Sequence, residues 1–232
     1  MEQRRTRQRH SRIVARNERL TAITAAILLV GFLIDLLFTA NLSRLIFIHI
    51  FLGTLLAGPL VVKLSSVGYR FLGYYTKSPA FVTKGPPNPW MRLLAPFFVV
   101  DTLLLFMSGL ALAISGSPNN RLLFLLHAGT AALWIPMLAV HVYFHIRQVP
   151  RAIWRDWIAP SPDAMVGRRK RLRINILALI VGALAGLIMV GVASPWKQVH
   201  LPPVIPSPLV LGLVAAVIGI VIAVPLLRGQ RE

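Results

Sequence analysis

Six apolar runs, each with at most one charged residue, constrain this chain more than any other feature of its sequence. They cover residues 20–40, 45–62, 93–114, 122–146, 174–193 and 209–227. Each run approaches the ~20 residues that a helix needs to cross a bilayer. Lipid offers no hydrogen bonds to an exposed backbone, so the runs must be helical. We therefore predict an all-α fold, a polytopic transmembrane helical bundle with six spans.

The basic residues are spread unevenly around these runs and indicate an orientation. The chain carries 25 Lys and Arg against 7 Asp and Glu. Of the basic residues, 22 lie in one set of segments: before the first run, between the second and third, between the fourth and fifth, or after the sixth. The other connections hold only Arg44, Arg121 and Lys197. Because basic loops stay in the cytoplasm, both termini are predicted to be cytoplasmic. The excess charge then faces anionic lipid headgroups, and we expect no nucleic-acid partner.

The same pattern divides the chain into one membrane domain and two tails. Residues 1–19 form a basic cytoplasmic tail, residues 20–227 the six-helix domain, and residues 228–232 a short cytoplasmic tail. The chain has no cysteine, which excludes disulfides, iron–sulfur clusters and a thiolate-ligated haem. Histidine, lysine and carboxylate side chains are therefore the candidates for chemistry inside the membrane.

Two histidines are predicted to lie at the same depth on different spans. His49 follows Arg44 by five residues, and His127 follows Arg121 by six. Both spans run inward from the extracytoplasmic side, so both imidazoles lie roughly 7–9 Å below the arginines at ~1.5 Å per residue. Ionisable groups in spans usually face the bundle interior. Two such imidazoles on separate helices suit a bis-histidine haem, in which each ring gives one nitrogen to the iron.

Small and acidic neighbours favour this haem hypothesis. Gly53 lies one turn beyond His49, and Ala131 lies one turn beyond His127, which leaves room for a flat macrocycle. The same small residues also suit close helix packing, and each histidine alone would more often be a buried, hydrogen-bonded residue. Asp35 is predicted at the depth of both histidines, where it can accept the free N–H of a ligand ring.

The cytoplasmic half of the fourth run holds a second group of candidates. His141 follows His127 by 14 residues, about 40° short of four whole turns, and His145 follows one turn later. Two stacked haems would use this spacing, but 14 residues after His49 the second run has Lys63 instead of a histidine. A second haem would therefore need another ligand. The alternatives are that Lys63 pairs with a haem propionate or a quinone oxygen, or that the two histidines only form a polar end of the span.

Asp101 lies near the middle of the third run. A carboxyl group at this depth is either a proton-relay group or a protonated side chain that is hydrogen-bonded to a neighbouring helix. The sequence leaves both interpretations open.

Three stretches of the chain resemble bacterial membrane-embedded b-type cytochromes. They are "HIFLGTLLAGPLVVKLSSVGYRFLGYYT", "KGPPNPWMRLLAP" and "LLHAGTAALWIPMLAVHVYFH", within residues 45–147. The pattern is similar to the cytochrome b subunits of formate dehydrogenases and nickel–iron hydrogenases, and to small haem membrane proteins of an actinobacterial type. The resemblance implies a bacterial plasma-membrane protein with haem b held by span histidines, here His49, His127 and His141. It also implies electron exchange between a quinone pool and a partner protein on the extracytoplasmic side.

We therefore expect a membrane b-type cytochrome with one haem b or two, and with quinone near Lys63 and His141 if quinone is used. We expect such a protein to be an electron-transfer subunit of an oxidoreductase complex rather than a stand-alone enzyme. Two alternatives use the same residues, a proton- or metal-coupled transporter and a membrane anchor without haem. The transporter is disfavoured because no broken helices recur at matching positions in two halves of the chain.

Overall fold

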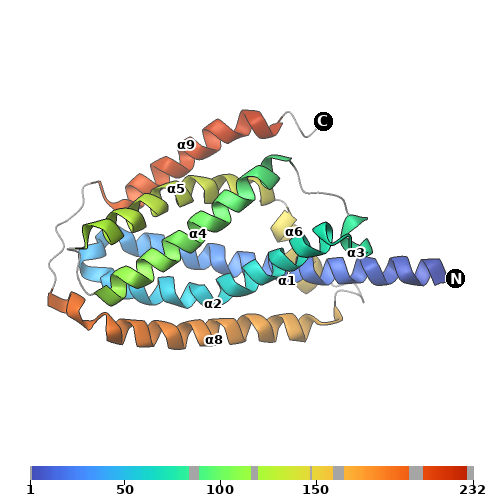
Figure 1. Cartoon of the computed structure of the whole chain (residues 1–232), viewed down its shortest axis with the longest axis horizontal. Coiled ribbons are helices and arrows are strands. Elements are labelled where there is room, and N and C mark those ends of the chain that lie inside the picture. Colours follow the sequence, from blue (N-terminus) through green and yellow to red (C-terminus); the bar gives the residue numbers. More distant parts are fainter. Residues whose placement is uncertain are drawn as a thin grey trace.

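The computed structural model describes residues 2–83, 89–115, 120–146, 148–158, 165–198 and 206–228, and these residues form helices joined by turns (Figure 1). The helices are α1 (Glu2–Phe38), α2 (Leu42–Tyr75), α3 (Pro79–Val82), α4 (Pro89–Ser115), α5 (Arg121–His145), α6 (Gln148–Trp157), α8 (Arg168–Val192) and α9 (Pro208–Arg228), with the 3-10 helices η1 (Thr39–Asn41) and η2 (Ser194–Gln198). The basic segment 1–19 continues the first span as helix from Glu2 onward. Residues 229–232 of the expected C-terminal tail lie outside the described residues.

Five helical stretches are long and apolar enough to cross a membrane, namely Arg12–Tyr75, Pro89–Ser115, Arg121–His145, Arg168–Val192 and Pro208–Pro225. The first has 64 residues because α1, η1 and α2 follow one another without a break. The chain nevertheless reverses within it. Asn17 of α1 donates to the carbonyl of Ser66 in α2 (3.0 Å), whereas Gly31 lies against Leu56. The α1 and α2 helices are therefore antiparallel neighbours, and the all-α membrane class predicted from the sequence is confirmed.

The ends of the long helices gather at two opposite ends of the bundle (Figure 1). One end holds the turn between α1 and α2, the end of α4 with the start of α5, and the end of α8 with η2. The start of α1 and the end of α9 lie at the other end. The three basic residues outside the main basic segments all lie at the first end of the bundle. Arg44 is in the first turn of α2, Arg121 begins α5, and Lys197 is in η2.

Small residues let α2 and α8 approach each other closely. A Cβ atom added to Gly58 would lie 2.0 Å from the carbonyl oxygen of Ala178, and one added to Gly182 would lie 2.1 Å from that of Leu55. Membrane helices associate mainly through such close packing, because lipid tails are as apolar as the side chains that they replace. This contact fixes α8 along the whole outer side of α2 (Figure 1).

Polar side chains join α1 to the rest of the bundle. Asn175 of α8, 1% exposed, accepts a hydrogen bond from the hydroxyl of Thr24 in α1 (2.8 Å) and donates to the carbonyl of Arg171 (2.9 Å). Large apolar side chains on the outward faces remain exposed, such as Leu122, Ile188 and Val221. Contiguous apolar surface of this extent is typical of a protein that faces lipid.

Candidate functional site

His49 of α2 and His127 of α5 lie opposite each other across the bundle, in an edge-on arrangement of the two rings. Their ring centroids are 6.2 Å apart, and the ring planes meet at 61°. The two helices are otherwise not packed on each other, because α2 packs mainly on α8 and α1, whereas α5 packs mainly on α4 and α9. The structure thus brings together the two imidazoles that the sequence predicts at equal depth.

Each ring is held through its Nδ1 atom by a neighbouring helix. His49 Nδ1 lies 3.0 Å from a carboxylate oxygen of Asp35 in α1. His127 Nδ1 lies 3.1 Å from the carbonyl oxygen of Leu105 and 3.3 Å from the hydroxyl of Ser108, both in α4. A carbonyl and an ionised carboxylate only accept hydrogen bonds, so Nδ1 carries the hydrogen in both rings. In neutral rings the Nε2 atoms are then free to bind a metal.

Two glycines shape the surroundings of the rings. A Cβ atom added to Gly109 of α4 would lie 2.8 Å from Cε1 of His127, so this ring occupies the place of a side chain on α4. Around Gly53, one turn from His49, an added Cβ atom would meet nothing within 4 Å. Gly53 therefore leaves open space beside His49, as a flat macrocycle at this position requires.

The distance between the rings fits two imidazoles that share one iron. Two metal–nitrogen bonds of about 2 Å, with roughly 1 Å more from each nitrogen to its ring centre, give about 6 Å between centroids. The two ring planes can take any angle about the common axis, so 61° is compatible. In the part of the chain that the structure describes, no three His, Asp or Glu side chains gather in a way that suits a bare metal ion. A haem supplies four nitrogens of its own and takes only axial ligands from the protein.

The inner candidates form a second group near the other end of α5. The rings of His141 and His145 contact each other at 4.7 Å, and Lys63 of α2 lies within electrostatic range of both. Lys63 Nζ donates to the carbonyl oxygen of Thr21 in α1 (3.3 Å), and His145 Nδ1 lies 3.1 Å from the amide oxygen of Gln148. Lys63 is therefore near enough to His141 and His145 to act on both electrostatically. These two rings, however, face each other from one helix and do not face an imidazole of α2.

Aromatic rings occupy the core between the two groups. Phe32 of α1 contacts Trp134 of α5 (4.7 Å), Trp134 stacks on Phe98 of α4 (5.8 Å), and Phe98 packs against the His141 ring (5.3 Å). Trp134 is 6% exposed, and its indole N–H donates to the hydroxyl of Thr102 (2.8 Å). The inner face of α5 below His127 is thus packed with side chains as far as His141.

Asp101 stands apart from both groups. Its side chain is buried in α4, and among the described residues its Oδ2 atom has no hydrogen-bond partner. The hydrogen bond to a neighbouring helix that one interpretation of Asp101 expects is therefore absent for this oxygen.

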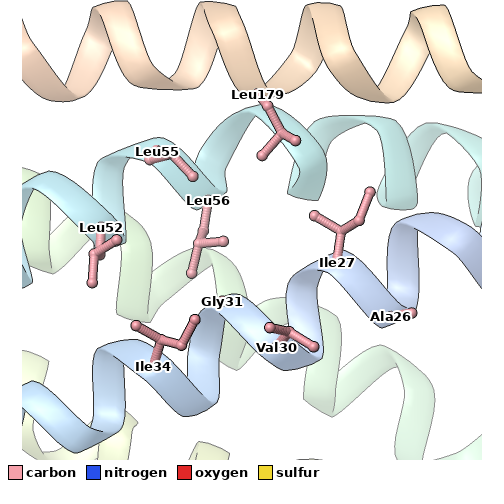
Figure 2. Close-up of a pocket in the computed structure, with 9 residues that line it drawn as sticks. All are labelled: Ala26, Ile27, Val30, Gly31, Ile34, Leu52, Leu55, Leu56 and Leu179. Atoms are coloured by element: carbon pink, nitrogen blue, oxygen red, sulfur yellow. The ribbon is translucent and has the colours of Figure 1, made fainter.

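An apolar groove of about 450 Å³ opens between α1 and α2 (Figure 2). It is lined by side chains between residues 26 and 34 of α1 and between residues 52 and 56 of α2, with Leu179 of α8 pointing toward it (Figure 2). None of these side chains is polar. The groove therefore offers no group for ligation or proton transfer, and neither histidine lines it.

Sequence reasoning missed several residues of the outer site. The carbonyl of Leu105 cannot be foreseen, because every residue carries one. Ser108 and Gly109 are adjacent within a mainly apolar run, and a polar residue next to a small one inside a span is the signal that could have identified them.

No protein-family model, curated protein or solved structure matches the chain. The class of protein therefore rests on the fold and the site. The apolar helices are those of a multi-pass membrane protein, and its core holds one imidazole pair contributed by two helices that are not packed on each other.

Proposed function

We propose that this protein is a membrane b-type cytochrome with one haem b, held by His49 and His127 near the extracytoplasmic side. The observation that carries the proposal is the pair of imidazoles 6.2 Å apart, each with Nδ1 bonded to a neighbouring helix.

The residues around the pair have defined tasks in this proposal. The two Nε2 atoms would hold the iron, and the bonds to Asp35 and to the Leu105 carbonyl would fix the orientation of each ring and raise its basicity. Bound there, haem b would supply a one-electron change between ferric and ferrous iron. The carboxylate of Asp35, 14% exposed, would balance the positive charge of the iron in a medium of low dielectric constant.

The arrangement around His141, His145 and Lys63 favours one haem over two. A second iron between α2 and α5 would need an imidazole opposite His141, and α2 provides Lys63 there. Phe98 and Trp134 fill the core beside His141. We therefore assign Lys63 and His141 to a quinone oxygen at the cytoplasmic end, as donors that could bind a carbonyl.

The orientation follows from the arrangement of the helices and the charges. Because α1 and α2 are antiparallel, Arg12–Tyr75 counts as two crossings, and we propose six spans with both termini in the cytoplasm. The protein would lie in a bacterial plasma membrane and carry electrons between a quinone pool and a redox partner on the extracytoplasmic side. The outer histidine pair is on the side of such a partner.

The test is the pigment of the purified full-length chain, produced with a haem supply. We expect a red protein whose Soret band sharpens and shifts on addition of dithionite. The variants His49→Ala and His127→Ala should each lose the haem completely, because one imidazole cannot hold a six-coordinate iron at this site. His145→Ala is the matched control and should keep full pigment, since its ring contacts His141 and Gln148 instead. A colourless parent, or full pigment in His49→Ala, would overturn the proposal.

A further inference from the structure

A pocket of about 310 Å³ lies where the end of α6 meets the start of α8, and neither His49 nor His127 lines it. It is lined by Trp157, Met165, Arg168, Arg169 and Leu172. Two of these side chains are cationic and the rest are mainly apolar, so the pocket is amphipathic. Such a lining suits a ligand that carries both an anion and a hydrocarbon part.

A buried ion pair fixes the two walls of the pocket. Asp156 of α6 accepts a hydrogen bond from the guanidinium of Arg171 in α8 at 2.5 Å, and the two side chains are 0% and 5% exposed. Arg171 also donates to the carbonyl oxygen of Val166 (3.2 Å), which holds the turn before α8. Removing one partner of a buried pair is costly, because a charge is left without compensation. The amphipathic helix α6 is therefore tied to the first turn of α8.

Among the described residues, no carboxylate neutralises the cations of the pocket. The guanidinium of Arg168 lies over the ring of Trp157, 4.4 Å from its centroid. Within the part of the chain that the structure describes, neither Arg168 nor Arg169 pairs with a carboxylate. Two adjacent guanidinium groups can make paired, charge-assisted hydrogen bonds to the oxygens of a phosphate.

The position of the pocket indicates that the phosphate belongs to a lipid headgroup rather than to a soluble anion. Arg168 begins α8, and Leu172 lies one turn later, two residues before the apolar run that starts at residue 174. The pocket thus lies at the end of a candidate membrane span, where the chain carries most of its basic residues. Basic pockets between helices at this level commonly bind the headgroups of anionic lipids.

We propose that this pocket binds one anionic phospholipid, with its phosphate on Arg168 and Arg169 and an acyl chain along Met165 and Leu172. The site is independent of the haem proposal, because it shares no residue with the histidine pair. Its role is to anchor the end of α6 and the start of α8 to the inner leaflet.

The experiment compares two double variants of the full chain in nanodiscs made of phosphatidylcholine with a small share of phosphatidylglycerol. Arg168→Gln with Arg169→Gln removes the two pocket cations. Lys170→Gln with Arg173→Gln removes two exposed cations of the same helix that do not line the pocket. Lipid retained after extraction into mild detergent is counted by native mass spectrometry. We expect one phosphatidylglycerol on the parent, at least a tenfold loss in the pocket variant, and no loss in the control variant.

Each other outcome contradicts the proposal. Equal loss in both variants would mean that general charge attraction is sufficient, and no loss in either would mean that the pocket does not bind the lipid. The parent alone gives a second readout that needs no variant to fold, because phosphatidylcholine with identical acyl chains should be retained at least tenfold less. If inorganic phosphate displaced the lipid at equal concentration, the site would belong to a soluble anion and the lipid assignment would be wrong.

Discussion

At the scale of the residue, the site depends on atoms that orient two rings. Asp35 and the Leu105 carbonyl each accept a hydrogen bond from Nδ1, so the tautomer of both histidines is set by α1 and α4. A metal-binding imidazole needs this second bond, because the bond fixes which nitrogen faces the metal. In our proposal, these two bonds make the pair suitable for holding an iron.

Gly109 offers a test of the ring position that changes neither histidine. In Gly109→Val the new side chain would meet the His127 ring, whose Cε1 lies only 2.8 Å from an added Cβ, and the ring would be displaced from its position against α4. We expect the variant to fold with a loss of about 1–3 kcal/mol in unfolding free energy and to lose most of its haem, as measured by pyridine haemochrome.

The matched control is Gly129→Val, two residues from His127, where an added Cβ meets nothing within 4 Å. It should retain the haem of the parent. If Gly109→Val kept as much haem as Gly129→Val, the His127 ring would not be held against α4 as described.

At the scale of the element, the sequence predicts the positions of the spans better than it predicts the contacts between their side chains. The apolar runs and the equal depth of His49 and His127 could be predicted, because length and depth depend only on position along a helix. The partners of these rings and the contacts of Trp134 could not. A spanning helix is apolar nearly all round, so its sequence does not indicate which face meets which neighbour.

The contact of α8 with α2 gives a prediction at this scale. Gly182→Val would force the two backbones apart, because an added Cβ already lies 2.1 Å from the Leu55 carbonyl oxygen. We expect a loss of about 1–3 kcal/mol, seen as a lower melting temperature by circular dichroism in detergent. Gly191→Val on the same helix, where an added Cβ meets nothing within 4 Å, should melt like the parent. Equal melting of the two variants would show that the close approach contributes nothing to stability.

At the scale of the whole molecule, the side chains of the proposed sites lie at two depths of the bundle and do not line its apolar groove. The depth that we propose to be extracytoplasmic has the histidine pair, and the other depth has His141, His145 and Lys63. Aromatic side chains, with Trp134 among them, pack the core between the two depths. In our proposal, electrons cross this packed region between a quinone on the inside and a haem on the outside.

The two depths differ in a way that predicts the number of haems. The spacing of the histidines in α5 alone would not predict this number. His127 faces an imidazole of α2, whereas His141 meets Phe98 and His145. In our proposal the chain therefore has one iron site, with two imidazole ligands.

Electron paramagnetic resonance of the oxidised full-length protein, combined with a haem count per chain, tests this claim most directly. The account predicts one haem per chain and a single low-spin ferric signal of the kind given by two imidazole ligands. Two haems per chain, a high-spin signal from a five-coordinate iron, or no haem at all would contradict it.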